Sequence, residues 1–180
     1  LIVCGSATSW ITKKIFSNKG GLFNRDTERI FLEPFTLKET EAFLNQKHVL
    51  LSRKDIAECY MIMGGIPYYL DKMEKGLSLS QNIDNIFFKK RARLWDEFSR
   101  LYESLFENPE QHLKIVKAIH SKRYGLTRKE ISMATGLPEN GKMTKTLQEL
   151  EDCGFISSSK DWLKNKKDRI YRLCDYFTLF

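Results

Sequence analysis

Side chains suited to binding nucleic acid gather in the last part of the chain. Residues 110–180 carry 14 basic and 9 acidic side chains, a net charge of +5, whereas residues 1–109 carry 16 and 14, a net charge of +2. The side chains that would contact DNA are Lys142, Thr144, Lys145 and Gln148 on the outward face of a predicted helix, and Lys164, Lys166 and Lys167 in a loop beyond it. If this part binds DNA, we expect the helix to enter the major groove and the loop lysines to meet phosphates. A basic excess of this size permits nucleic-acid binding without demonstrating it.

The sequence predicts no metal site and contains no phosphate-binding loop. The cysteines and histidines are far apart, with no C-x-x-C pair and no histidine at metal-ligand spacing. The loop G-x-x-x-x-G-K-[ST], which cradles phosphates, is missing, as is an apolar strand ending in acidic residues for Mg²⁺. We therefore expect that these 180 residues alone do not hydrolyse ATP.

The start of the chain has the pattern of a parallel sheet. Leu1–Cys4 is an unbroken apolar run, typical of a strand buried on both faces, and Arg29–Leu32 is a second candidate strand. Thr8–Lys19 between them predicts a helix. The predicted fold is mainly α with a small α/β remnant, and we expect the parent protein to supply the other strands upstream.

Helices follow one another after Pro34. Thr36–Glu39 is a capping box, and Ser52–Asp55 repeats its logic before a helix that Gly64-Gly65 would end. Three further helices are predicted, over Tyr68–Lys75 after Pro67, over Leu79–Phe88 and over Ala92–Phe106. Asn108-Pro109 interrupts the helical pattern, and the charge balance changes just beyond it, so we place a domain boundary there.

The residues after Pro109 have a winged-helix pattern. The predicted helices are His112–Lys122, a second from the capping box Thr127–Glu130 to Gly136, and Pro138–Cys153. The predicted strands Phe155-Ile156 and Ile170–Leu173 are joined by the basic loop Leu163–Asp168. Three helices followed by a hairpin make a helix-turn-helix with a wing.

The order of these segments resembles a known family, the archaeal-type P-loop ATPases of the STAND branch. These proteins are related to AAA+ ATPases and often carry a winged helix and a nuclease-like domain behind the ATPase. The segments that carry the resemblance are Leu1–Ser6, Leu22–Arg25 before the strand leading to Pro34-Phe35, Met63–Leu70 and Thr127–Ile156. The resemblance implies the end of a P-loop NTPase core over 1–35, a helical lid over 36–108 and a winged helix over 109–180. Asp175–Phe180 leaves open whether a nuclease-like domain follows.

The resemblance implies catalytic roles for two residues. Ser6 matches a polar sensor residue, whose hydroxyl could hold the attacking water or a phosphate oxygen. The alternative is that Ser6 caps the helix beginning near Thr8. Arg25 matches an arginine that stabilises charge on the transferring phosphate, since a guanidinium can bind two phosphate oxygens at once. The alternative is a surface arginine paired with Asp26 or Glu28.

The resemblance also implies a cofactor-binding turn in the lid. Gly65-Ile66-Pro67 resembles the family's G-x-P motif, in which the proline and its backbone contact the base of the nucleotide. Glycine allows close approach to a flat ring, and proline offers a rigid apolar face. The alternative is that a glycine helix end followed by a proline helix start explains the same residues.

Two functions follow as expectations. The first is the C-terminal portion of an ATP-binding ATPase, in which ATP with Mg²⁺ is held by upstream segments, is sensed by the lid and moves the winged helix. The alternative is a winged-helix DNA-binding transcriptional regulator. The partner of the winged helix would be double-stranded DNA or a protein. No apolar run reaches the roughly 20 residues of a membrane span and no signal peptide is recognised, so we expect no membrane contact and a cytoplasmic location.

Overall fold

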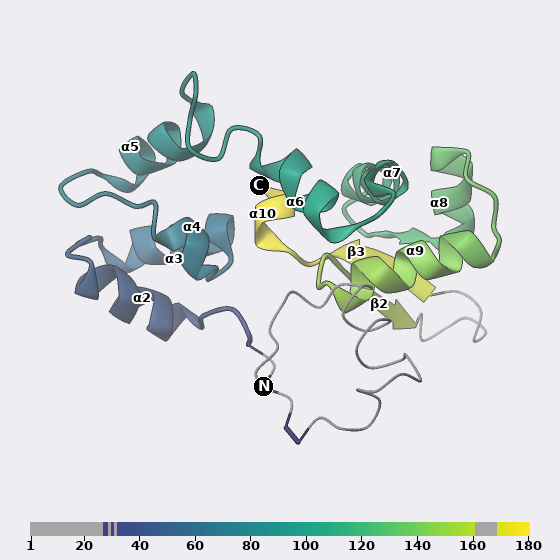
Figure 1. Cartoon of the computed structure of the whole chain (residues 1–180), viewed down its shortest axis with the longest axis horizontal. Helices are drawn as coiled ribbons and strands as arrows, with labels where there is room; N and C mark the ends of the chain where they lie inside the picture. The colour runs from purple at the N-terminus through teal and green to yellow at the C-terminus, as the bar shows by residue number, and fades with distance from the viewer. Residues whose placement is uncertain (1–26, 29, 31, 161–168) are drawn as a thin grey trace. The chain divides into compact units, whose positions relative to one another are not determined.

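The computed structural model describes residues 27, 28, 30, 32–160 and 169–180. Within them the fold is mainly helical, with one three-stranded antiparallel sheet (Figure 1). The described chain forms two compact units. The first, which we call the helical unit, contains Ile30–Ser99 and Tyr176–Phe180. The second, which we call the mixed unit, contains Arg100–Asp175.

The elements divide between the units as follows. The helical unit contains α2 (Leu37–Gln46), α3 (Arg53–Met63), α4 (Pro67–Leu70), α5 (Leu79–Ile83), the π-helix η2 (Asp84–Phe88) and α10 (Tyr176–Leu179). Helix α6 (Glu97–Leu105) passes from the helical unit into the mixed unit. The mixed unit continues with α7 (Pro109–His120), β1 (Leu126–Thr127), α8 (Arg128–Thr135), α9 (Gly141–Asp152), β2 (Ile156–Lys160) and β3 (Arg169–Leu173).

Side-chain caps fix the starts of α2 and α3, as predicted. Thr36 Oγ1 accepts the amide of Glu39 at 3.3 Å, and the Glu39 carboxylate accepts the amide of Thr36 at 2.8 Å. Ser52 Oγ accepts the amide of Asp55 at 3.1 Å. The two helices pack together through buried side chains that include Leu44 and Met63. The caps thus set where each helix begins, and the spacing of its apolar residues sets which face is buried.

Helix α4 is shorter than the predicted Tyr68–Lys75, which is wrong at its C-terminal end. Gly64 ends α3 in the left-handed conformation and Pro67 begins α4, both as predicted. Beyond Leu70 the amides of Lys72 and Met73 donate to the carbonyls of Tyr69 and Leu70, so the chain closes into tight turns. These bonds span three residues and not the four of an α-helix, and the Lys47 ammonium binds the carbonyl and the carboxylate of Asp71 at this turn.

The two helices predicted next are present with changed bounds. The predicted Leu79–Phe88 is helical throughout, but it changes from α in α5 to π in η2 at Asp84. The predicted Ala92–Phe106 begins only at Glu97, because Leu94 donates its amide to Ile86 at 2.9 Å and so lies outside a helical pattern.

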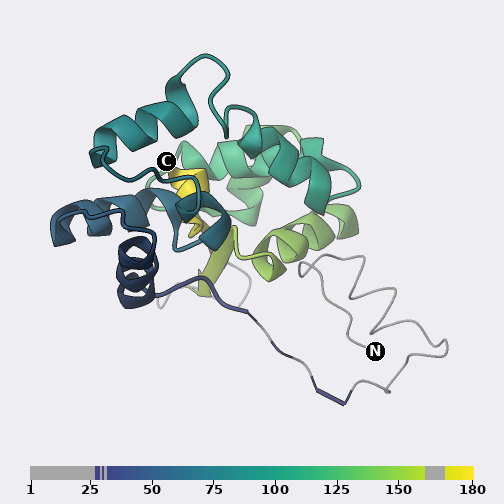
Figure 2. The same cartoon turned by 60° about the vertical axis from the view of Figure 1, so that its left-hand side comes forward.

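The last helix, α10, returns to the helical unit and lies against α3, as Figures 1 and 2 both show. The Phe177 ring lies 4.9 Å from the ring of Tyr69 and 5.8 Å from that of Phe87, measured between centroids. Tyr176 contacts Tyr60, with centroids 5.6 Å apart. The core of the helical unit is therefore completed by residues remote from it in sequence.

The helices of the mixed unit bury apolar side chains in a shared core. The capping box at Thr127 and the left-handed Gly136 define α8 as predicted. Helix α9 begins at Gly141 and not at Pro138, because the Asn140 side chain accepts the amides of the first turn and so caps the helix there. The side chains at the centre of this core are Ile115, Ile119, Ile131, Leu147 and Leu150.

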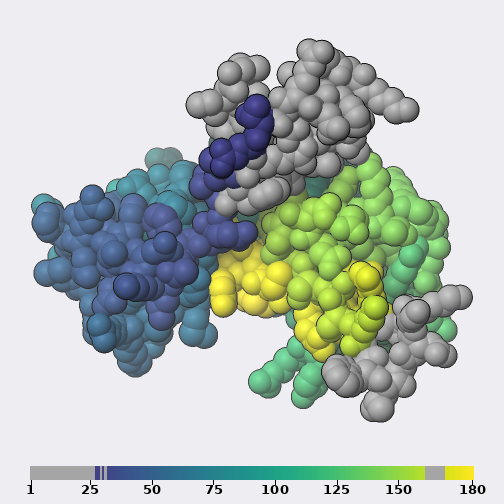
Figure 3. Space-filling model, turned by 90° about the horizontal axis from the view of Figure 1, so that it is seen from below, coloured from purple at the N-terminus to yellow at the C-terminus, as the bar shows by residue number. Residues whose placement is uncertain are grey.

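The sheet has the order β1-β3-β2 and is antiparallel throughout. Tyr171 pairs with Leu126 on one side and with Ser158 on the other. Strand β1 was not predicted; Gly125 makes it possible, because an added Cβ there would lie 2.4 Å from the carbonyl oxygen of Tyr171. Helix α9 packs beside β2, and the space-filling view shows their yellow-green atoms next to the yellow atoms of β3 (Figure 3).

Several predictions concern the chain before Pro34. The strand Leu1–Cys4 and the helix Thr8–Lys19 lie outside the described residues. Of the predicted strand over residues 29–32, the described Ile30 and Leu32 are exposed and are not in a strand.

The division between the units differs from the predicted domain boundary at Asn108-Pro109. Residues from Arg100 onward belong to the mixed unit, and the buried Tyr102 ring stacks on Phe155 at 4.7 Å. In the described ranges, none of the helices combines the length and apolar character needed to cross a bilayer.

Candidate nucleic-acid interface

Helix α9 presents the residues predicted to contact DNA on its outer face. Met143, Leu147 and Leu150 are buried against the rest of the mixed unit, which fixes the rotation of the helix. The four predicted contact residues on this helix are all exposed: Lys142, Thr144, Lys145 and Gln148. The structure shows that all four are exposed, and that Lys142 and Lys145 line a hollow shared with α7.

Neighbouring groups already engage three of these four side chains. The Lys145 ammonium lies 3.6 Å from the Glu149 carboxylate, and Gln148 donates to Asp152 at 2.8 Å. Thr144 Oγ1 donates to the carbonyl of Asn140 at 3.2 Å. The ammonium group of Lys142 has no acidic partner among the residues that the structure describes. Lys142 is thus the cation on this face most available to an incoming phosphate.

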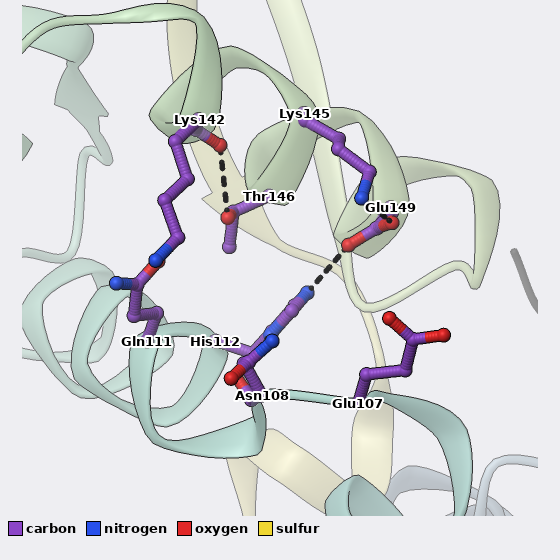
Figure 4. Close-up of a pocket in the computed structure, with 8 residues that line it drawn as sticks. All are labelled: Glu107, Asn108, Gln111, His112, Lys142, Lys145, Thr146 and Glu149. Carbon is purple, nitrogen blue, oxygen red and sulfur yellow. Dashed lines mark hydrogen bonds and ion pairs between the residues drawn. The ribbon is translucent and has the colours of Figure 1, made fainter.

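A buried histidine joins α7 to α9 beneath this face. His112 Nε2 lies 3.1 Å from the Glu149 carboxylate and Nδ1 lies 3.0 Å from the carbonyl oxygen of Asn108 (Figure 4). Both partners of the ring are acceptors when Glu149 is ionised, so both bonds form when both ring nitrogens carry protons. The ring also stacks on Phe106 with centroids 3.8 Å apart. His112 is therefore a packing residue, and it was predicted only as an isolated histidine.

The hollow around His112 is too small to be a nucleotide site. It encloses about 50 Å³, whereas ligand pockets usually enclose some 300 Å³ or more. Its lining residues are Glu107, Asn108, Gln111, His112, Lys142, Lys145, Thr146 and Glu149 (Figure 4). Within the described ranges no three or more His, Cys, Asp or Glu side chains gather closely enough to hold a metal ion.

The charge along α9 changes sign from its first turn to its last. Lys142 lies in the first turn, whereas Glu149, Glu151 and Asp152 lie in the second half. Burial, together with the charges of Asp152 and Glu149, raises the pKa of Cys153 at the C-terminus of α9 to about 11. A phosphate would therefore meet attraction at the N-terminal half of this face and repulsion at the other.

One residue that supports this face was missed by sequence reasoning. Arg128, at the start of α8, donates to the carbonyl oxygen of Asn140 at 2.7 Å. It thereby holds the residue that caps α9. In the sequence, Arg128 is marked only by its position next to the capping residue Thr127, and no sequence pattern indicates that it contacts Asn140.

The predicted cofactor-binding turn has its two ends in different environments. Gly65 is buried with φ of +70°, and an added Cβ would lie 2.1 Å from the carbonyl oxygen of Phe35. The amide of Phe35 donates to the carbonyl of Gly65 at 2.9 Å. Ile66 is half-buried, and Pro67 is exposed. The structure thus uses Gly65 to pack against another segment, while the proline face remains accessible.

Five predicted site residues lie outside the described part of the chain: Ser6, Arg25, Lys164, Lys166 and Lys167. Their predicted roles therefore stay predictions. Arg169, the first described residue after the basic loop, is exposed and donates to Ser158 at 3.3 Å.

Comparison with known proteins gives one distant relative. The chain is 28% identical, over 183 aligned positions and its full length, to an uncharacterized protein of Methanocaldococcus jannaschii. The chain spans 39% of the length of that protein. No protein-family model matches the chain. No solved structure matches it either.

Proposed function

We propose that the mixed unit is a winged helix that binds duplex DNA through the exposed face of α9. The observation that carries the proposal is the joint exposure of Lys142, Thr144, Lys145 and Gln148 on a helix whose opposite side is buried. The order of helices and strands and the sheet order β1-β3-β2 support it, since a helix-turn-helix followed by a hairpin places its last helix on the surface.

The contacts on this face indicate how DNA would bind. Lys142 would meet a phosphate directly, because its ammonium has no acidic partner in the described part of the chain. Lys145 would give up its ion pair with Glu149, and Gln148 its hydrogen bond to Asp152, to contact DNA. Each exchange costs the energy of a contact already made, so we expect modest affinity that depends strongly on salt.

The test uses fluorescence anisotropy to measure binding of a labelled duplex of about 20 base pairs at several salt concentrations. The double variant Lys142→Ala/Lys145→Ala should lower the affinity about tenfold or more. It should also make the slope of log affinity against log salt concentration shallower, by the amount expected for the loss of up to two phosphate contacts. The matched control is Lys114→Ala/Lys117→Ala, two exposed lysines of the same spacing on α7. Equal losses in the two double variants would show that α9 is not the contact face.

A second function is favoured by the exposed proline of the lid turn. We propose that the helical unit is the lid of an ATP-binding ATPase of the STAND type, in which Pro67 contacts the base of the nucleotide. Pro67 and the neighbouring Tyr68 are exposed at the start of α4, where a planar base could lie against them. The distant relative, of which this chain spans 39%, is consistent with a longer parent protein.

Nucleotide binding in the complete parent protein tests this second function. Pro67→Ala should raise the Kd for ATP several-fold, because the rigid apolar face is lost. Pro138→Ala, which changes an exposed proline of the mixed unit, is the control. Arg25→Ala should instead slow ATP turnover more than it weakens ATP binding. Unchanged Kd in Pro67→Ala would remove the lid turn from the nucleotide site.

A further inference from the structure

The segment between α5 and α6 concentrates positive charge and exposed aromatic rings. Residues 88–95 read Phe-Lys-Lys-Arg-Ala-Arg-Leu-Trp, with four basic side chains and no acidic one. Phe88 and Trp95, at its two ends, are 62% and 68% exposed. Cations close to exposed aromatic rings are typical of surfaces that bind single-stranded nucleic acid.

The segment is a pinned loop with a defined conformation. Ile86 and Leu94 are buried, and the amide of Leu94 donates to the carbonyl of Ile86 at 2.9 Å, which closes the base of the loop. At the tip, the amide of Ala92 donates to the carbonyl of Lys89 at 2.8 Å. Figure 1 shows this part of the chain as a narrow teal loop beyond α5. The side chains at the tip are therefore presented by a closed turn.

Two backbone features at this loop are uncommon. Arg91 has φ of +65°, a conformation that residues other than glycine rarely adopt. The loop also follows directly from the π-helix η2, and π-turns occur frequently at functional sites. A strained residue at the tip of a loop motivates a functional hypothesis, because glycine would be the unstrained choice there.

Neighbouring acids neutralise two of the four cations and leave two at the tip. Lys89 lies 3.7 Å from Asp84, and Arg93 pairs with Glu74. Lys90 and Arg91 are exposed, and neither has an acidic partner among the residues that the structure describes. Within the described part of the chain, the tip therefore carries two cations that no carboxylate neutralises.

We propose that this loop is a binding site for single-stranded nucleic acid, with Lys90 and Arg91 on phosphates and Trp95 stacked on a base. A duplex would hide the faces of its bases from the aromatic rings, whereas an unpaired strand offers them. A membrane surface fits less well, since the exposed rings of Phe88 and Trp95 lie at the two ends of the segment and its tip carries charged side chains. The site is independent of the duplex-binding face proposed for α9.

The test measures binding of the full chain to a labelled oligothymidylate of about 20 nucleotides by fluorescence anisotropy. Lys90→Ala/Arg91→Ala should lower the affinity about tenfold and reduce the salt slope by about 1.4, the value for two phosphate contacts on a single strand. Trp95→Ala should lower the affinity about fivefold or more through the lost stacking. The control is Lys38→Ala/Lys75→Ala, which removes two exposed lysines elsewhere in the helical unit.

Two further variants separate binding from folding. Arg91→Gly should weaken binding and at the same time leave the thermal midpoint equal or higher, because it removes both the charge and the backbone strain. Arg91→Lys should keep most of the binding. All effects should persist in the Lys142→Ala/Lys145→Ala background, which separates this site from the α9 face.

Three results would overturn the proposal. The first is equal affinity in Lys90→Ala/Arg91→Ala and in the control pair. The second is a larger loss of affinity for duplex DNA than for oligothymidylate in Lys90→Ala/Arg91→Ala, which would show that the loop prefers a duplex. The third is that the protein binds vesicles containing phosphatidylserine, and that Lys90→Ala/Arg91→Ala abolishes this binding but leaves oligothymidylate binding unchanged.

Discussion

Gly65 shows how one residue can satisfy a functional motif and a packing requirement at once. Its φ of +70° and its contact with the Phe35 backbone both require that no side chain be present. The sequence offered a nucleotide-contacting turn and a helix end as alternatives for this glycine. The structure provides a third reason for it, close approach to a segment that precedes α2 in sequence.

Substitution of Gly65 should therefore destabilise the protein far more than substitution of a loop glycine. Gly65→Ala should lower the free energy of unfolding by at least about 3 kcal/mol. The new Cβ would clash with the carbonyl oxygen of Phe35, and the alanine backbone would have to adopt the left-handed conformation. Gly76→Ala is the matched control: its φ is +79° but nothing lies within 4 Å of the added Cβ, so the cost should be about 1 kcal/mol. Urea unfolding measures both; equal costs would contradict the packing role.

The thiols should differ in reactivity according to burial. Burial raises the pKa of Cys59 to about 12 from 9.0; partial burial and the charge of Asp175 also raise the pKa of Cys174, but the Cys174 side chain is exposed. In a Cys4→Ser background at about pH 8, a thiol reagent should modify Cys174 rapidly and Cys59 only after addition of denaturant. Equal rates in the native protein would show that Cys59 is accessible.

The same pKa shift sets the sign of a stability effect at high pH. Cys59 keeps its proton in the folded state above pH 9, where the unfolded state releases it. The folded state therefore binds more protons, and the free energy of unfolding should fall as pH rises from about 9 towards 12. Cys59→Ala should flatten this part of the stability profile.

At the scale of elements, helix starts could be predicted because their signals are local. The capping boxes at Thr36 and Thr127 form within a few residues, and both are present as predicted. The helix ends at Gly64 and Gly136 were predicted for the same reason. The exposed face of α9 followed from the spacing of Met143, Leu147 and Leu150.

Elements that depend on distant partners could not be predicted. Strand β1 has only two residues, and its partner Tyr171 lies far along the chain. Lys47 binds the carbonyl of Asp71 just beyond α4, a contact across 24 residues that no local pattern encodes. The pairing of His112 with Glu149 across α7 and α9 was hidden for the same reason.

The two residues that begin α9 should change its stability in opposite directions. Asn140→Ala removes the acceptor for two amides of the first turn, at 3.0 and 3.2 Å, and should destabilise the protein by about 1 kcal/mol. Gly141→Ala should stabilise it by about 0.5 kcal/mol, because Gly141 has open space for a Cβ and the unfolded chain loses freedom. Thermal unfolding measures both. A loss of stability in Gly141→Ala would show that this position needs glycine.

At the scale of the whole molecule, the helical unit is discontinuous in sequence. The chain leaves it through α6, forms the mixed unit, and returns at Tyr176. Sequence reasoning assigned the last residues to the winged helix or to a further domain, because nothing local indicates that an aromatic run at the end of the chain belongs to a core formed much earlier. From Ile30 onward the chain crosses between the units after Ser99 and again after Asp175, and movement of one unit could reach the other through these covalent links.

The contribution of this returning segment can be measured at Phe177. Phe177→Ala should cost about 3–5 kcal/mol, because the ring is buried between Tyr69 and Phe87. The loss should appear as faster amide hydrogen exchange in α3 and α4, with α7 and α9 unchanged, since the ring belongs to the core of the helical unit.

Phe180→Ala is the control for this experiment. Its ring contacts Phe87 and Phe88 but is 51% exposed, so its removal should raise exchange much less. Faster exchange confined to α7 and α9 in Phe177→Ala would place this aromatic segment in the mixed unit. Unchanged exchange everywhere would show that the helical unit folds without it. Only faster exchange in α3 and α4 agrees with a helical core that the end of the chain completes.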